Sequence, residues 1–180
     1  MAKPLKITEP PQVIDEVFGL ISCAATGREV LGEFFPHYHL GKITIRNYPE
    51  EVAKKLRASH SKEQPSGASF VTDGRTGMIY VDFQSELGIL APFLLHEMVH
   101  SLDERLWVSA RMNLGETERN KIIIESETHA FEFQYRFVQE LMQIVPELDE
   151  FFSQCYPKAK ILRERMTVEE IRKLYGIKAA

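Results

Sequence analysis

Residues 94–100 constrain the fold of this chain more than any other stretch, because they place three polar groups inside an apolar segment. They read Leu-Leu-His-Glu-Met-Val-His, which contains the pattern H-E-x-x-H in a run that predicts a helix. His96 and His100 are one helical turn apart and project from the same face, so both imidazoles can bind one metal ion. Glu97 follows His96 by about 100° of rotation, which places its carboxylate beside such an ion rather than on it.

The residues around the motif indicate that this helix is buried. Five of them are apolar: Leu94, Leu95, Met98, Val99 and Leu102. Unpaired histidine and glutamate side chains are costly in such surroundings, and a divalent metal ion is the simplest compensating partner. We therefore expect His96 and His100 to bind Zn²⁺. The alternative is a metal-free helix in which the two histidines only pack or cap.

A catalytic zinc ion commonly has three protein ligands, so a further ligand is expected elsewhere in the chain. A second helical pattern runs over about 116–145, and four residues form its apolar centre: Ala130, Phe133, Phe137 and Leu141. At 100° per residue, Glu127 lies about 60° from that centre, at the buried edge. Glu125, His129 and Glu132 lie about 140°, 100° and 160° from it. Helical phase thus predicts Glu127 as the third ligand, with His129 as the alternative.

Periodicity elsewhere predicts strands before the motif helix and helices at both ends of the chain. The expected strands are 42–46, 68–72 and 78–82, of which the last two form a hairpin around the turn-rich segment 73–77. The expected helices outside the motif and the long helix are 10–21, 28–35, 49–56, 147–152 and 167–176, the last of which begins with a capping-box match. The segment 36–39 is expected to be a polar loop or the entry to a strand, and 60–67 is expected to be an exposed loop. Pro92 is expected in or near the first turn of the motif helix.

These elements predict an α+β fold. A small mixed or antiparallel sheet would pack on the motif helix and on the long helix that bears Glu127, with extra helices at the N- and C-terminal ends. At 180 residues the chain is long enough for one domain with a substantial core. We place that core at about 42–145 and the helical extensions at 1–41 and 146–180.

Charge, cysteine content and hydropathy exclude several classes of protein. The net charge is −4 and no basic stripe is evident, so a nucleic-acid partner is not expected. Cys23 and Cys155 lie far apart without C-x-x-C spacing, which argues against a disulfide framework or a zinc ribbon. The N-terminus lacks an apolar signal segment, and no apolar run approaches the ~20 residues of a membrane span. We therefore expect no membrane partner and a cytoplasmic location.

The pair of motif histidines, followed by Glu127 on the next long helix, resembles the zinc site of gluzincin-type metallopeptidases, in particular the small single-domain kind. The resemblance covers about 42–141 and implies a minimal zincin-like domain. It implies that His96, His100 and Glu127 bind zinc and that Glu97 is the general base and acid. It also implies that an upstream strand, 78–82, is the sheet edge that binds an extended substrate.

The chain departs from the usual sequence pattern of that family at two positions. Thr128 stands where a small alanine commonly follows the glutamate ligand, and Phe131 stands where an acidic residue commonly follows it by four positions. Support for a motif histidine through its second ring nitrogen must then come from elsewhere, and Asp103 is the candidate. The alternative for Asp103 is a solvated acid in the last turn of the motif helix.

The resemblance implies a zinc-dependent metallopeptidase that hydrolyses a peptide or protein substrate with a water molecule activated by zinc and by Glu97. A further donor should stabilise the tetrahedral oxyanion, and the candidates are Tyr135, His129 and Tyr80.

Three other classes stay open. One is a zinc amidase acting on a non-peptide substrate. Another is a DNA-associated protease of the SprT type, which has similar residues at the motif. That type requires a third histidine in place of Glu127, and usually a cysteine zinc ribbon and a basic surface. The last is a latent or non-catalytic zincin scaffold that serves as a regulatory binding module.

Overall fold

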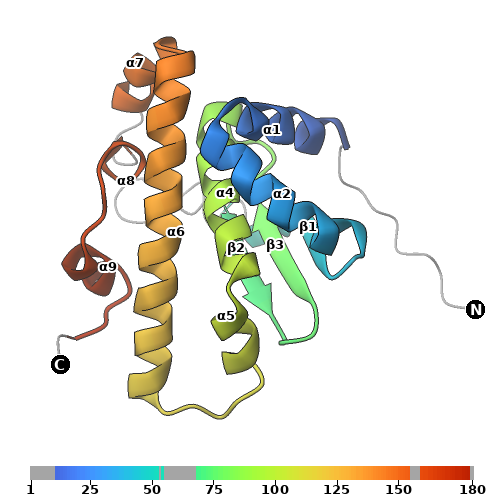
Figure 1. Cartoon of the computed structure of the whole chain (residues 1–180), viewed down its shortest axis with the longest axis vertical. Coiled ribbons are helices and arrows are strands. Elements are labelled where there is room, and N and C mark those ends of the chain that lie inside the picture. The colour runs from blue at the N-terminus through green and yellow to red at the C-terminus, as the bar shows by residue number, and fades with distance from the viewer. Residues whose placement is uncertain (1–10, 53, 55–67, 155–158, 179–180) are drawn as a thin grey trace, which may run out of the picture.

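The computed structural model describes residues 11–52, 54, 68–154 and 159–178. The described elements in chain order are α1 (Pro11–Cys23), α2 (Ala25–His39), β1 (Ile43–Asn47), β2 (Ala68–Thr72), β3 (Gly77–Val81), α4 (Leu87–Leu102), α5 (Glu104–Ser109), α6 (Glu116–Ile144), α7 (Glu147–Gln154), α8 (Ala159–Arg163) and α9 (Val168–Leu174). The fold is therefore mixed α and β, as predicted, with one small sheet among many helices (Figure 1).

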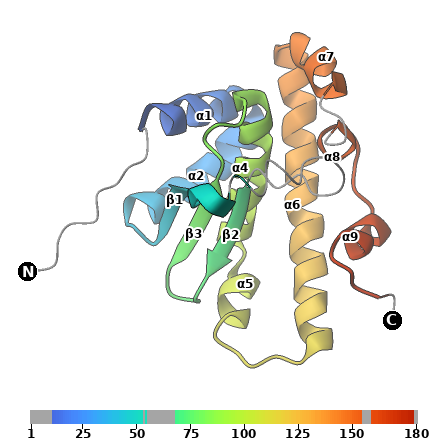
Figure 2. The same ribbon diagram turned by 180° about the vertical axis from the view of Figure 1, so that it is seen from behind.

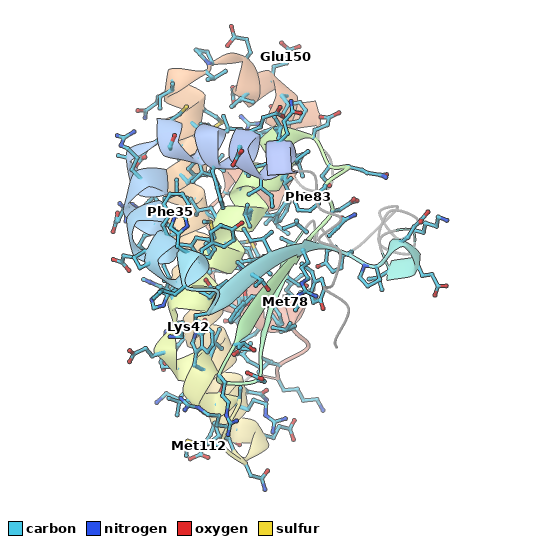
Figure 3. The ribbon with its side chains drawn as sticks, turned by 90° about the vertical axis from the view of Figure 1, so that its right-hand side faces the viewer. Phe35, Lys42, Met78, Phe83, Met112 and Glu150 are labelled. Atoms are coloured by element: carbon cyan, nitrogen blue, oxygen red, sulfur yellow. The ribbon has the colours of Figure 1, made fainter. Side chains whose placement is uncertain are left out.

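The motif helix α4 lies in the middle of the molecule. The long helix α6 runs along one side of it and the sheet lies along another, while α1 and α2 cross over it (Figure 1). Seen from behind, the sheet lies in front of α4, and α7, α8 and α9 lie on the far side of α6 (Figure 2). Figure 3 gives a side view, with Phe35 on the N-terminal helix pair and Met78 on the sheet.

Helix α4 is central because it is apolar on nearly every side. Leu90, Leu94, Leu95 and Met98 are at most 1% exposed, and a helix that is hydrophobic all round must be covered on all faces. It begins at Leu87, about one turn earlier than expected from the sequence, so that Pro92 is its sixth residue.

The sheet has the order β1-β3-β2, in which β3 pairs with β1 in parallel and with β2 in antiparallel fashion. The hairpin prediction is thus confirmed, and Gly74 turns it with a φ of +81°. The prediction that 78–82 is an edge strand is wrong, because β1 pairs with the other side of β3 and makes it central. The strand left at the edge beside α4 is β2.

Helix α2 continues through 36–39, which the sequence suggested to be a loop or a strand entry. Two ring pairs at helical spacing accompany this last turn. The Tyr38 ring stacks on Phe34 with centroids 5.6 Å apart, and the His39 ring stacks on Phe35 at 5.4 Å. Such i, i+4 contacts favour the helix although Pro36 lies inside it.

Helix α6 matches its prediction at both ends, since it starts at Glu116 and stops at Ile144, before Pro146. The helices α5, α7, α8 and α9 all pack against it. Its second half is tied to the N-terminal helices by Glu140, whose carboxylate accepts from the N–H of Thr26 at 2.8 Å and from its hydroxyl at 2.6 Å. Helix α9 begins with the predicted capping box at Thr167, and Gly176 follows it with a φ of +65°.

Several expectations lie outside the described residues: the loop 60–67, residues 53, 55 and 56 of the helix expected over 49–56, and Cys155. Cys23 is exposed and free. Among the described residues, no helix combines the length and the apolar character that crossing a membrane requires.

Candidate metal centre

Three side chains predicted as metal ligands converge at the interface of α4 and α6. His96 Nε2 lies 3.2 Å from Glu127 Oε2, His100 Nε2 lies 3.2 Å from Glu127 Oε1, and the two Nε2 atoms are 3.0 Å apart. The carboxylate therefore faces both imidazoles with one oxygen each. No other group of histidine, cysteine or acidic side chains among the described residues is close enough to hold a metal ion.

The helices place these groups as their periodicity predicts. His96 and His100 occupy successive turns of α4 on the face toward α6, and Glu127 stands at the buried edge of α6. All three residues are at most 8% exposed. Glu125 and His129, the neighbours of Glu127 in sequence, are exposed, in agreement with the phase of the helix.

Burial disfavours charged side chains at this site, but the contacts among the three side chains favour their charged forms. Burial raises the pKa of Glu127, but hydrogen bonds from His100 and His96 and their charges outweigh it, so that the pKa lies far below its usual range. Burial lowers the pKa of His100, but the hydrogen bond and charge of Glu127 outweigh it and raise the pKa above its ordinary value. Without a metal ion, the three side chains therefore satisfy one another as a buried ion pair.

The same arrangement fits a divalent cation. Two imidazole nitrogens and a carboxylate form a donor set that suits zinc, and one ligand atom from each residue lies within 4.8 Å of the others. His96, His100 and Glu127 would hold such an ion. With three protein ligands, such an ion would keep a further coordination position for water or substrate.

That cavity measures about 570 Å³, and Glu97 lines it beside the three converging side chains. Glu97 is half-buried, and its Oε2 accepts a hydrogen bond of 2.7 Å from the backbone N–H of Phe70 in β2. Because Phe70 pairs with Ile79 across the hairpin and sends its N–H to Glu97, this N–H points away from β3, toward the free edge. Among the described residues, no group donates to the other oxygen of Glu97.

The C-terminal part of the chain also lines the cavity, and the sequence did not predict this contact with the site. Tyr175 follows α9 and lines the cavity. The residue is 46% exposed, but burial of its phenol and, next, the negative charge of Glu127 raise the pKa of Tyr175 well above its ordinary value. The capping box predicts helix α9 but carries no signal of where that helix docks.

The three residues considered as oxyanion donors lie elsewhere, and none of them lines the cavity. Tyr80 stacks on Tyr48 with ring centroids 5.7 Å apart, and the guanidinium of Arg165 lies over the ring of Tyr135 at 5.3 Å. His129 is exposed and contacts Phe133, on a different face of α6. Glu132, also weighed as a ligand, pairs instead with Arg165 at 2.8 Å.

The second ring nitrogens of the two histidines have different surroundings. His100 Nδ1 lies 2.9 Å from Ser126 Oγ, and Ser126 in turn hydrogen-bonds to Asp103. Asp103, predicted as the support of a motif histidine, is thus connected to His100 through a serine that sequence reasoning missed. His96 Nδ1 is buried without a hydrogen-bond partner in the described part of the chain, and the Phe131 ring packs against this imidazole.

Comparison of the chain with protein-family models, with curated proteins and with solved structures found no match. What the site can do therefore follows from its own geometry and chemistry.

Proposed function

We propose that the chain is a zinc-dependent metallopeptidase of the gluzincin type with a compact zincin-like domain. The observation that carries the proposal is the convergence of His96, His100 and Glu127 from two helices on one point beside a cavity that Glu97 also lines. These are the four residues to which the resemblance assigns metal binding and proton transfer. A bound zinc ion would activate water and polarise a carbonyl group.

The proposed role of Glu97 is that of general base and then general acid. One carboxylate oxygen is held by the Phe70 N–H, which fixes the orientation of the group. No described residue donates to the other oxygen, which can take a proton from water. The carboxylate then passes the proton to the leaving nitrogen of the scissile amide. Its half-buried position on the cavity wall leaves it accessible to a substrate.

The proposed substrate platform is the free edge of β2. Ala68, Ser69 and Phe70 line the cavity, and an edge strand offers a row of backbone groups to an extended peptide. A peptide added along this edge would lie beside Glu97, which already accepts from the outward N–H of Phe70. This placement favours a peptide over a small amide, which would have no use for the backbone groups of the strand.

Tyr175 takes the proposed role of the further donor. Its phenol keeps its proton because its pKa is raised, and the residue lines the cavity together with Glu127. A neutral phenol there can donate a hydrogen bond to the oxyanion of a tetrahedral intermediate.

The substitution Glu97→Gln tests the proposal. The variant keeps the size of the side chain and touches no proposed ligand, so we expect it to bind zinc like the wild type while hydrolysis of a peptide library falls by about 10²–10⁴-fold. Metal content is measured by mass spectrometry and cleavage by product analysis. A zinc-loaded variant with full hydrolytic activity would show that Glu97 is not the base, and a wild type that binds no divalent metal would overturn the whole proposal.

A further inference from the structure

A chain of buried polar contacts leads from His100 away from the cavity. His100 Nδ1 lies 2.9 Å from Ser126 Oγ, and the Ser126 hydroxyl hydrogen-bonds to the carboxylate of Asp103. Ser126 is 2% exposed and the side chain of Asp103 is 7% exposed, so water competes little for either group. Three helices contribute one residue each, because His100 belongs to α4, Ser126 belongs to α6, and Asp103 caps α5.

Asp103 is held in place from its other side by Arg105. The guanidinium contacts both carboxylate oxygens, with Nε 2.9 Å from Oδ1 and Nη2 2.8 Å from Oδ2, and the Arg105 backbone N–H donates to Oδ1 at 3.0 Å. Burial opposes ionisation of Asp103, but the hydrogen bonds from Arg105 and Ser126 outweigh it and lower the pKa. Asp103 is therefore an ionised carboxylate, which accepts hydrogen bonds and donates none.

The ionised Asp103 selects one arrangement of hydrogens in this chain. Ser126 has a single proton, and Asp103 can only accept, so the serine donates to the aspartate. The oxygen of Ser126 must then accept from His100, which puts a proton on Nδ1. In the neutral imidazole the lone pair is left on Nε2, the atom that faces Glu127 and His96.

We propose that Ser126, backed by Asp103, is the positioning residue of His100: it holds the imidazole in the tautomer and orientation that present the Nε2 lone pair to a divalent cation. The cation belongs to the proposed function, on which this part of the inference rests, whereas the tautomer is a property of the metal-free chain. Position 131 holds a phenylalanine without an acceptor, so this hydroxyl relay is the support that one motif histidine receives and the other lacks.

The test compares two buried serines. Ser126→Ala removes the hydroxyl that contacts His100. Ser101→Ala is the matched control, because Ser101 is also 2% exposed and directly follows His100, but its hydroxyl donates to the carbonyl of Met98 at 2.7 Å. Both substitutions delete one buried oxygen from a helix and leave every proposed ligand in place.

Two readouts are expected to separate the variants. In metal-free protein, at a pH high enough to leave the ring neutral, ¹⁵N NMR should show His100 protonated on Nδ1 in the wild type and in Ser101→Ala. In Ser126→Ala the signals should shift toward a mixture of the two tautomers. Zinc affinity, measured by competition with a chelator, should fall about 10–100-fold in Ser126→Ala and change less than about twofold in Ser101→Ala.

An unchanged tautomer together with unchanged zinc affinity in Ser126→Ala would overturn the proposal. A wild type that binds no zinc would instead overturn the proposed function. In that case the NMR comparison of the metal-free proteins still decides whether Ser126 orients His100.

Discussion

The ring of Phe131 packs edge-on against the ring of His96, with the two centroids 4.5 Å apart. Phe131 is four residues after Glu127, one turn along α6, and so lies directly beside the ligand set. His96 Nδ1 has no hydrogen-bond partner among the described residues, and an unpaired buried polar group costs about 1–3 kcal/mol. On its Nδ1 side His96 is therefore held by packing, whereas His100 is held there by a hydrogen bond with Ser126.

The substitution Phe131→Asp should give His96 the acceptor that it lacks. Zinc should bind about tenfold more tightly to Phe131→Asp than to Phe131→Leu, which removes the ring without adding an acceptor. Both variants should lose about 2–5 kcal/mol in the free energy of unfolding, because the ring is buried. Chelator competition and denaturant titration measure the two quantities. Equal zinc affinity in the two variants would contradict the expected role of an acceptor here.

Metal-free protein should lose stability as the pH rises from mildly acidic to alkaline. The pKa of His100 is raised above 6.5, so its pairing contributes stability that is fully present below pH 6.5 and lost as the pH passes the raised value. The pKa of Glu127 is lowered from 4.5, so its contribution is fully present above pH 4.5 and lost on acidification through the lowered value. These two groups together stabilise the metal-free fold most between those two pH values.

Urea titrations in the presence of a chelator at several pH values between 5 and 9 check this dependence. Glu127→Gln removes the charge that raises the pKa of His100 and should flatten the decline at alkaline pH. Zinc-loaded protein should not show the decline, because metal binding already requires deprotonated ligands. A metal-free wild type whose stability rises steadily toward pH 9 would contradict the ion pair.

The hydrogen bond from the Phe70 N–H to Glu97 predicts an effect of the backbone on catalysis. Phe70→Pro removes this N–H, and proline is tolerated at an edge position whose N–H points away from the sheet. Phe70→Ala is the control, since both variants lose the ring that packs near Trp107 but only proline lacks the donor. We expect kcat for Phe70→Pro to lie about 10-fold or more below that for Phe70→Ala. Equal kcat values would mean that the contact does not orient the base.

Two tyrosine variants, one inside the cavity and one outside it, test the proposed donor to the oxyanion. Tyr175→Phe removes a hydroxyl that lies at Glu127 and should lower kcat by about 10²-fold while zinc affinity is retained. Tyr135→Phe removes a hydroxyl outside the cavity and should leave kcat unchanged. Steady-state kinetics on one cleaved peptide is sufficient. Similar kcat values for both variants would exclude Tyr175 as the donor to the oxyanion.

Local periodicity explains what the sequence predicts well. The bounds of α6 and the buried position of Glu127 follow from a helical repeat that is visible within the helix itself. The hairpin of β2 and β3 follows from two β-branched runs around a glycine-containing turn, and the start of α9 follows from its capping box. Each of these features depends on residues that are neighbours in the chain.

Contacts between distant segments explain what the sequence does not predict. The parallel pairing of β1 with β3 decides which strand is at the edge, and no turn residue encodes it. Tyr175 reaches the cavity only because α9 docks on α6, and Ser126 meets His100 only because α4 and α6 face each other at this register. Serine is common on helices, so its residue type alone gives no indication of such a contact.

Two of the converging groups belong to α4 and the third belongs to α6, so the distance between these helices sets the size of the site. A bound ion would hold the two helices together, and a change that moves the helices apart would weaken its binding. Ala130 is fully buried one turn after Glu127, and its small side chain takes up little space there. A bulkier side chain at this position would therefore be expected to weaken the retention of a bound ion.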